Sequence, residues 1–356
     1  MLWDILTGWI DRDSDKFVYK RIDSNHVDRQ LNESPLEAGR HYVRLRLSEM
    51  FLKKAVSGAT AWYPAVHSLV RFDFGNQKQV EIPNIADSTR VGLQQTNHGD
   101  VIARNFALTP AMPFSGGLVS VSAALMAIKG QNYLNNFIGV LSNFANLLAV
   151  PQLSAALSIA KPLAAGIQEL FGAGQGDLHL GLYETFGSGE LKAGYVVAIR
   201  ATEADVDPNR LWVVEDALRE GDELGAGQHV PFTRFDYMLF RVEIFEERDD
   251  WAKLTYIDEP FQQAMDALQN DDEKKADLFI KTALRRAIGA PDLTEADQTR
   301  VVDALKGRYT TARDKLKISG LTEETLPSLK SEMKLAMSVH LALQKGRPTL
   351  EDLLEI

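Results

Sequence analysis

The densest acidic segment of the sequence is Glu246-Glu-Arg-Asp-Asp250, which holds four carboxylates within five residues. Carboxylates at this spacing have the chemistry to bind a cation or a basic protein surface. The segment follows an alternating run that predicts a β-strand, and solvated charges at a strand end contribute little to stability. We take as a candidate acidic patch for a basic partner the residues Glu246, Glu247, Asp249 and Asp250.

A second acidic segment, Asp11-Arg-Asp-Ser-Asp15, resembles the start of a calcium-binding loop. The sixth position of such a loop needs glycine for a sharp turn, and the twelfth needs a bidentate glutamate. Lys16 and Ile22 stand at these two positions. The spacing therefore does not predict a calcium site, and a solvated turn is the expected structure.

Histidine spacing and the lack of cysteine limit metal and nucleophile chemistry. The seven histidines are scattered, and no two lie four residues apart as in helical zinc sites. The chain has no cysteine, which excludes thiol catalysis and cysteine-ligated metals. It also has no Gly-x-Ser-x-Gly sequence and no phosphate-binding loop in strand–loop–helix order. We therefore expect no metal site and no cofactor.

The net charge of −10 is unevenly placed along the 356 residues. Residues 176–255 hold 17 acidic and 8 basic side chains, whereas residues 1–175 hold 14 and 16, and residues 256–356 hold 18 and 15. An acidic block disfavours nucleic acid and favours basic partners or solubility. The apolar start of the chain has no positive segment before it, so it does not predict a signal peptide. We expect a cytoplasmic protein without a nucleic-acid partner.

Strand-like alternation dominates the first 255 residues. Alternating runs cover residues 40–47, 70–74, 80–82 and 237–245. Gly75-Asn76 predicts a hairpin turn, and Pro83 predicts a strand end or an edge strand. The polar sides of the first and last runs carry Arg44 and Arg46, and Arg241 and Glu243. Short spacers without helices favour an antiparallel sandwich or barrel over a doubly wound parallel sheet.

From about residue 260 the apolar spacing changes to that of α-helices. Phe261, Met265 and Leu268 share one face of the first predicted helix. The third predicted helix begins at Thr294, with Asp297 as a weak capping box, and its apolar face carries Val301, Leu305 and Tyr309. The second and fourth helices are predicted over residues 274–288 and 322–344.

The centre of the chain is almost free of charge, because Lys129 is the only charged residue between Asn105 and Ala160. Residues 133–150 show a helical pattern with neutral polar side chains opposite apolar ones. Residues 152–171 form a second helical run with small residues four apart, which permit close helix packing. We take as candidate partner or membrane contacts the residues Phe137, Ile138, Leu141, Phe144 and Leu148.

This uncharged segment has three candidate placements: in the protein's own core, against a partner, or in a bilayer. The apolar side chains of residues 133–150 gain roughly 15–30 kcal/mol on leaving water. The five asparagines at 132–146 each lose roughly 2–7 kcal/mol in hydrocarbon. Because the two sums are similar, a permanent membrane span is not favoured. We expect a buried helical hairpin at about 130–172, with membrane contact only after a trigger.

Together these patterns predict an α+β protein with two domains. Residues 1–255 are expected to form an antiparallel β-sandwich-like domain that carries the uncharged helical hairpin as an insertion at about 130–172. Residues 256–356 are expected to form a C-terminal α-helical domain.

Three function classes are compatible with these residues. We favour a non-enzymatic cytoplasmic module that binds a protein partner in assembly or regulation. The alternative is a conditionally membrane-active effector that uses residues 130–172. The second alternative is an enzyme whose site is built from residues distant in sequence. Self-association is left open.

Overall fold

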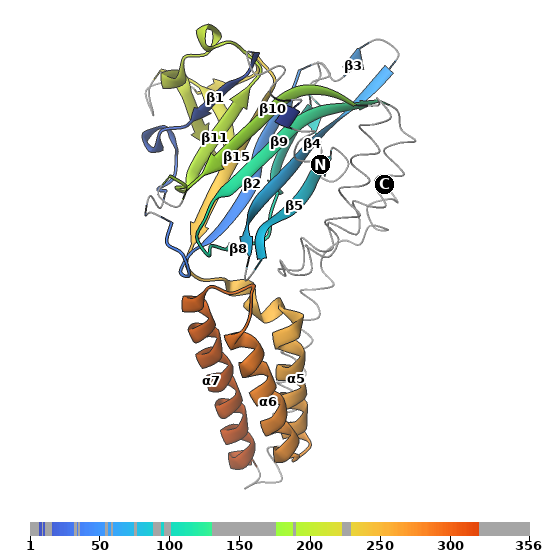
Figure 1. The fold of residues 1–356 in the computed structure, drawn as a ribbon, viewed down its shortest axis with the longest axis vertical. Coiled ribbons are helices and arrows are strands. Elements are labelled where there is room, and N and C mark those ends of the chain that lie inside the picture. Colours follow the sequence, from blue (N-terminus) through green and yellow to red (C-terminus); the bar gives the residue numbers. More distant parts are fainter. Residues whose placement is uncertain are drawn as a thin grey trace. The chain divides into compact units, whose positions relative to one another are not determined.

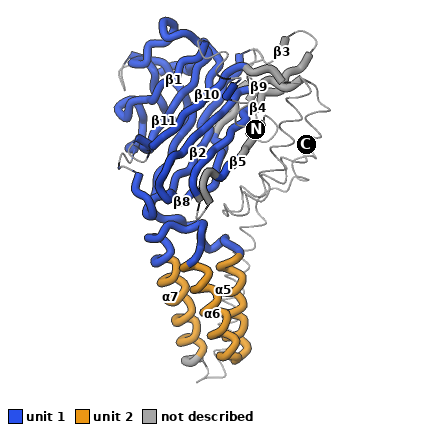
Figure 2. The backbone as a smooth tube through the Cα atoms, viewed as in Figure 1, with its two compact units in different colours: residues 1–255, 289–300 blue, residues 256–288, 301–356 orange. Residues whose placement is uncertain are grey.

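The chain divides into two compact units (Figure 2). One consists of Met1–Thr255 with Gly289–Arg300, and the other of Tyr256–Ile288 with Val301–Ile356. The computed structural model describes residues 7–8, 10, 16–31, 34, 36–53, 56–57, 60–74, 77–87, 94–95, 101–129, 176–187, 190–222 and 229–319. The hairpin expected at 130–172 and the fourth predicted helix lie outside these residues.

The fold is mixed α+β, with antiparallel sheets followed by three C-terminal helices (Figure 1). All pairs between named strands in the described ranges are antiparallel. The α+β class and the antiparallel pairing predicted from the sequence are therefore confirmed.

The largest sheet has seven strands in the order β1-β11-β15-β2-β7-β6, and β8 pairs with β2. Its strands are β1 (Val18–Arg21), β2 (Tyr42–Leu52), β6 (Gln94–Gln95), β7 (Val101–Ala107), β8 (Met112–Pro113), β11 (Gly194–Ile199) and β15 (Tyr237–Phe245). The long pair β2–β15 forms from two of the alternating runs, and it extends from Tyr42 opposite Phe245 to Phe51 opposite Tyr237.

The second sheet has five strands in the order β10-β9-β4-β3, and β5 pairs with β4. Its strands are β3 (Val56–Ser57), β4 (Thr60–Phe74), β5 (Gln77–Asp87), β9 (Val119–Lys129) and β10 (Gly176–Phe186). The predicted hairpin is confirmed, because Phe74 pairs with Gln77 across the turn. Pro83 lies in β5, whose strand partner in the described part of the chain is β4, as expected of an edge strand.

Side chains from both large sheets share one hydrophobic cluster. Leu45, Leu47 and Val242 contribute from the seven-stranded sheet, and Val70 and Val121 contribute from the five-stranded sheet. Alternate residues of a strand point to opposite faces. The apolar alternation therefore explains which face of each sheet is buried, and each such side chain contributes about 1.5–3 kcal/mol.

A third sheet of β12 (Leu211–Val214), β13 (Ala217–Glu220) and β14 (Val230–Pro231) packs on the opposite face of the seven-stranded sheet. Leu218 of the small sheet shares a second hydrophobic cluster with Val197 and Leu239 of the large one. Leu239 and Arg241 are two residues apart on β15, so both side chains point to this face. We call it the outer face.

In the described part of the chain, three α-helices follow the strands: α5 (Thr255–Gln269), α6 (Glu273–Ile288) and α7 (Glu295–Ser319). Phe261 and Leu268 are buried as predicted, and Met265 is half-buried. The core positions predicted for the third helix are also buried: Val301, Leu305 and Tyr309. Short 3-10 turns occur at Ser24–His26, Glu203–Asp205, Pro208–Arg210 and Asp249–Lys253.

The predicted cap of α7 forms in part. The backbone N–H of Asp297 donates to the Thr294 hydroxyl at 3.2 Å, which is half of a capping box. The Asp297 carboxylate accepts from other residues of the first unit. None of the described helices combines the length and apolar character that crossing a bilayer requires.

Candidate functional site

The predicted acidic patch lies at the end of β15 and in the 3-10 turn that follows it. Glu246 accepts two hydrogen bonds from Arg40, at 3.0 and 3.2 Å. Glu247 lies 3.6 Å from the guanidinium of Arg300. Asp249 is exposed. The carboxylates of this patch are therefore partly neutralised by arginines of the same unit, and its role towards a basic partner stays a prediction.

Asp250, the fourth member of the patch, belongs to a buried network around Arg248. Arg248 is 2% exposed, and it donates to Asp250 at 2.7 Å and to the carbonyl of Asp292 at 3.0 Å. Its backbone N–H and the Tyr42 hydroxyl both donate to Asp297, at 3.1 and 2.8 Å. This network fixes the end of β15 against residues 289–300 and gives Arg248 a structural role.

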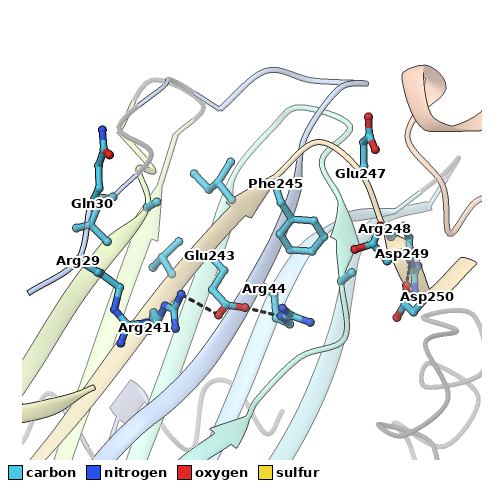
Figure 3. Close-up of a pocket in the computed structure, with 15 residues that line it drawn as sticks. Arg29, Gln30, Arg44, Arg241, Glu243, Phe245, Glu247, Arg248, Asp249 and Asp250 are labelled. Atoms are coloured by element: carbon cyan, nitrogen blue, oxygen red, sulfur yellow. Dashed lines mark hydrogen bonds and ion pairs between the residues drawn. The ribbon is translucent and has the colours of Figure 1, made fainter. Parts of the chain in front are cut away.

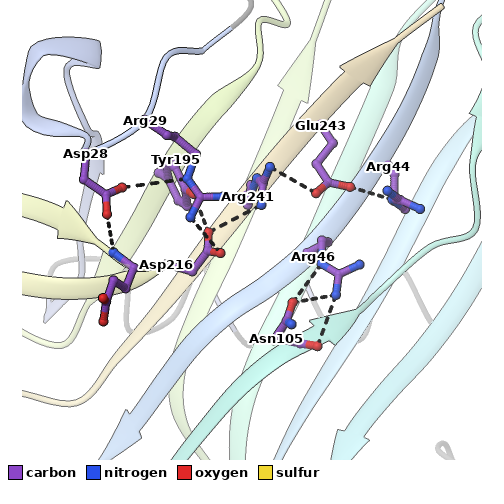
Figure 4. A network of polar contacts seen from close by, with 10 residues as sticks. Asp28, Arg29, Arg44, Arg46, Asn105, Tyr195, Asp216, Arg241 and Glu243 are labelled. Atoms are coloured by element: carbon purple, nitrogen blue, oxygen red, sulfur yellow. Dashed lines mark hydrogen bonds and ion pairs between the residues drawn. The ribbon is translucent and has the colours of Figure 1, made fainter. Parts of the chain in front are cut away.

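A second charged group, which we call the arginine band, lies on the outer face beside the small sheet (Figure 4). It brings together strands β2 and β15, the loop before residue 30 and the turn between β12 and β13. Its charged members are Arg29, Arg44, Arg46, Arg241, Asp28, Asp216 and Glu243.

Two carboxylates link most of the band into a chain of alternating charges. Glu243 accepts from Arg44 at 2.5 Å and lies 3.4 Å from Arg241. Asp216 lies 3.5 Å from Arg241 and 3.0 Å from Arg29. Each of these two acids is therefore shared by two arginines.

Arg46 differs from the other arginines of the band. Its Nε and Nη2 donate to the neutral Asn105 side chain at 3.2 and 2.5 Å, and it forms no ion pair within the described ranges. The strand register places Arg46 opposite Arg241, with Arg44 two residues away on the same face. Burial lowers the pKa of Arg46. Glu243 opposes this shift, whereas Arg44 and Arg241 add to it. Directly opposed like charges destabilise a sheet.

Backbone strain accompanies this charge arrangement. Four non-glycine residues among those described have positive φ, and three belong to the band or contact it: Asn105 at 60°, Glu215 at 54° and Asp216 at 62°. Such conformations cost about 1–3 kcal/mol each and concentrate at functional sites. The strained turn holds Asp216 where it accepts a hydrogen bond from Tyr195.

A pocket of about 480 Å³ connects the arginine band with the acidic patch (Figure 3). Phe245 forms part of its wall, and the Arg44 guanidinium carbon lies 5.2 Å from the centre of that ring. Its charged lining residues are Arg29, Arg44, Arg241, Glu243, Glu247, Arg248, Asp249 and Asp250. The pocket therefore presents four arginines and four carboxylates beside an apolar wall.

The alternating sequence pattern predicts polar strand faces for Arg44, Arg46 and Arg241, but it does not predict a site there. Arg44 and Glu243 are 199 residues apart, and only the β2–β15 register brings them together. The sequence pattern that could have pointed to this site is a pair of arginines on one side of a predicted strand. Such a pair alone is typical of a solvated strand face. Residues 1–255 thus contain a candidate site of opposite sign to the one predicted.

The other predicted site residues are not placed by the structure. The apolar contacts proposed in the uncharged segment, Phe137, Ile138, Leu141, Phe144 and Leu148, lie outside the described residues. Within the described ranges, no group of three or more histidine and carboxylate side chains is arranged to hold a metal ion.

Comparisons with protein-family models, with curated proteins and with solved structures give no significant match to this chain.

Proposed function

We propose that the protein is a non-enzymatic binding module whose contact surface is the arginine band. The partner we infer is a protein that presents acidic side chains to the outer face of the seven-stranded sheet. Arginines on a rigid sheet suit this task, because their planar guanidinium groups match carboxylate and phosphate geometry.

The observation that carries the proposal is Arg46, a half-buried cation that lies opposite Arg241 and forms no ion pair within the described ranges. A sheet that served stability alone would place an acid or a neutral residue there. An incoming anion supplies the missing charge. The neighbouring pocket, with Phe245 in its wall, adds apolar contact area.

The proposal includes a sandwich-like arrangement of the two large sheets. Its support is the hydrophobic cluster that both sheets share. In such an arrangement one face of the seven-stranded sheet is used for the core, and the outer face is available for a partner next to the small sheet.

Site-directed photocrosslinking in cells that make the protein tests this function. A photoreactive amino acid replaces Gln30, which is exposed and lines the pocket, or Asn209, which is exposed in the 3-10 turn Pro208–Arg210. We expect a discrete crosslinked protein from position 30 and none from position 209. Arg46→Glu combined with the probe at position 30 should abolish the product.

The crosslinked protein, once identified and purified, should bind the full chain in reconstitution. No product from position 30, or equal products from both positions, would refute the arginine band as the contact surface. A product that survives Arg46→Glu unchanged would do the same.

A further inference from the structure

We propose that Arg44 and Arg46 together form an oxyanion-binding site, which takes a carboxylate or a phosphate group on a side chain of the partner. This inference rests on the proposed function and specifies the chemical group that the arginine band recognises. A carboxylate and a phosphate group are both oxyanions, and the experiment below distinguishes between them.

Arg44 and Arg46 have N–H groups that are available to an anion. A guanidinium has five N–H groups. Arg44 uses Nε for Glu243, and Arg46 uses Nε and Nη2 for Asn105. Within the described ranges, both Nη atoms of Arg44 and Nη1 of Arg46 donate to no protein acceptor. An anion between these side chains would accept hydrogen bonds that the fold itself does not use.

The positions of Arg44 and Arg46 on β2 also favour a shared anion site. Arg44 and Arg46 are two residues apart on β2, so both point to the outer face at a spacing of about 7 Å. Figure 4 shows them as neighbours beside Asn105 and Glu243, whereas Arg241 extends towards Asp216. One oxyanion with two or more acceptor oxygens can accept hydrogen bonds from two guanidinium groups.

The arginines of the band outnumber its carboxylates around Arg46. Glu243 is shared between Arg44 and Arg241, so one carboxylate serves two cations, and Arg46 adds a third. Asp216 is already shared between Arg241 and Arg29. An anion at Arg46 would complete the alternation of charge that runs through the rest of the band.

Contacts within the protein already hold the side chains of Arg44 and Arg46 in place. Asn105 holds Arg46 through its side chain and its backbone carbonyl, and Asn105 itself has a left-handed backbone with φ of 60°. The Arg44 guanidinium is held by Glu243 and lies 5.2 Å from the Phe245 ring centre. Donors fixed before binding lose little conformational entropy when the ligand arrives.

The experiment is a titration of the full chain with three probes at low ionic strength, with binding measured by isothermal calorimetry. The probes are inorganic phosphate, a hexaglutamate peptide, and a glycine–serine peptide with one phosphoserine. Hexaglutamine and the unphosphorylated peptide are the neutral controls. We expect at least one anionic probe to bind and the neutral controls not to bind.

Matched variants locate the binding. Arg44→Gln and Arg46→Gln should each lower the affinity for the probe about tenfold. This is the loss expected for one charge-assisted hydrogen bond. Arg210→Gln makes the same charge change at an exposed arginine that pairs with Asp222, and it should leave affinity unchanged. Arg46→Lys keeps the charge and loses the guanidinium fork, so it should bind more weakly than the native chain even where a glutamine variant fails to fold.

Binding of the glutamate peptide alone assigns a carboxylate source, and binding of phosphate and the phosphopeptide alone assigns a phosphate source. Either outcome supports the site if Arg44 and Arg46 carry the affinity. The inference is overturned if no anionic probe binds, or if the Arg44 and Arg46 variants bind like Arg210→Gln. The Gln30 crosslink would persist in that case if the proposed function is right, and it would be absent if both are wrong.

Discussion

Arg46 is a residue whose position makes sense for binding more than for stability. Like charges directly opposite in a sheet cost about 0.2–1 kcal/mol, and exposed hydrogen bonds such as those to Asn105 return a similar amount. We therefore expect Arg46→Gln to change the free energy of unfolding by less than about 1 kcal/mol. Urea denaturation measures this, and a loss of several kcal/mol would instead give Arg46 a structural role.

Arg248 is the opposite case, an arginine that the fold needs. It is 2% exposed, and it bonds to Asp250 and the carbonyl of Asp292. We expect Arg248→Ala to lower the free energy of unfolding by about 1–3 kcal/mol, since it removes a donor from the buried carbonyl of Asp292. Arg210→Ala, at an exposed ion pair, should cost less than about 0.5 kcal/mol. Similar losses in the two variants would contradict this assignment.

His67 predicts a pH dependence of stability. It is fully buried in β4, and burial lowers its pKa from the usual 6.5 to about 3. Between these values the unfolded chain binds a proton that the folded chain does not, so stability falls as pH decreases below about 6.5. This group alone should remove about 2 kcal/mol between pH 7.5 and pH 5.

Urea denaturation of the native chain and of His67→Gln at both pH values checks this contribution. The variant should lose less stability on acidification than the native chain. An identical loss in His67→Gln and the native chain would show that His67 does not titrate in this way.

At the level of elements, the turn between β12 and β13 carries most of the strain found near the site. Glu215 and Asp216 both have positive φ, where Asn-Gly is the preferred pair. The Glu215 backbone N–H donates to Asp28 at 2.6 Å, which anchors the turn to the arginine band. The strain therefore positions Asp216 next to Arg29 and Arg241.

Relieving this strain should stabilise the protein. We expect Glu215→Asn to raise the free energy of unfolding by about 0.5–1 kcal/mol, because asparagine tolerates the left-handed region and keeps the backbone donor. Glu215→Ala should give no such gain. Thermal unfolding followed by circular dichroism compares the two, and equal midpoints would contradict a strained turn at this position.

Individual elements could be predicted well from the sequence, because their signals are local. The run 237–245 matches β15, and the helical period predicted from about residue 260 lies within α5, which already begins at Thr255. The pairing of β2 with β15 could not be predicted, since alternation fixes which face a side chain takes but not which strand lies beside it. The capping box at Thr294 failed in part because Asp297 binds Tyr42 and Arg248 instead.

At the scale of the whole molecule, net charge was a poor guide to the candidate site. Residues 176–255 hold most of the excess acid, yet Arg241 from this block joins Arg44 and Arg46 on one sheet face. Charge sums describe long-range fields, whereas recognition depends on which side chains share a surface. Three members of the acidic patch predicted from the sequence, Glu247, Asp249 and Asp250, line the same pocket as Arg44 and Arg241.

Arginine footprinting with phenylglyoxal tests the contact surface most directly. The chain is isolated from its cells at moderate salt with its partner bound, and a second sample is stripped of partner at high salt before labelling. The account predicts that the partner protects Arg44 and Arg46 from modification and leaves Arg210 equally reactive in both samples. Equal labelling of Arg44 and Arg46 with and without partner would contradict the arginine band as the binding surface.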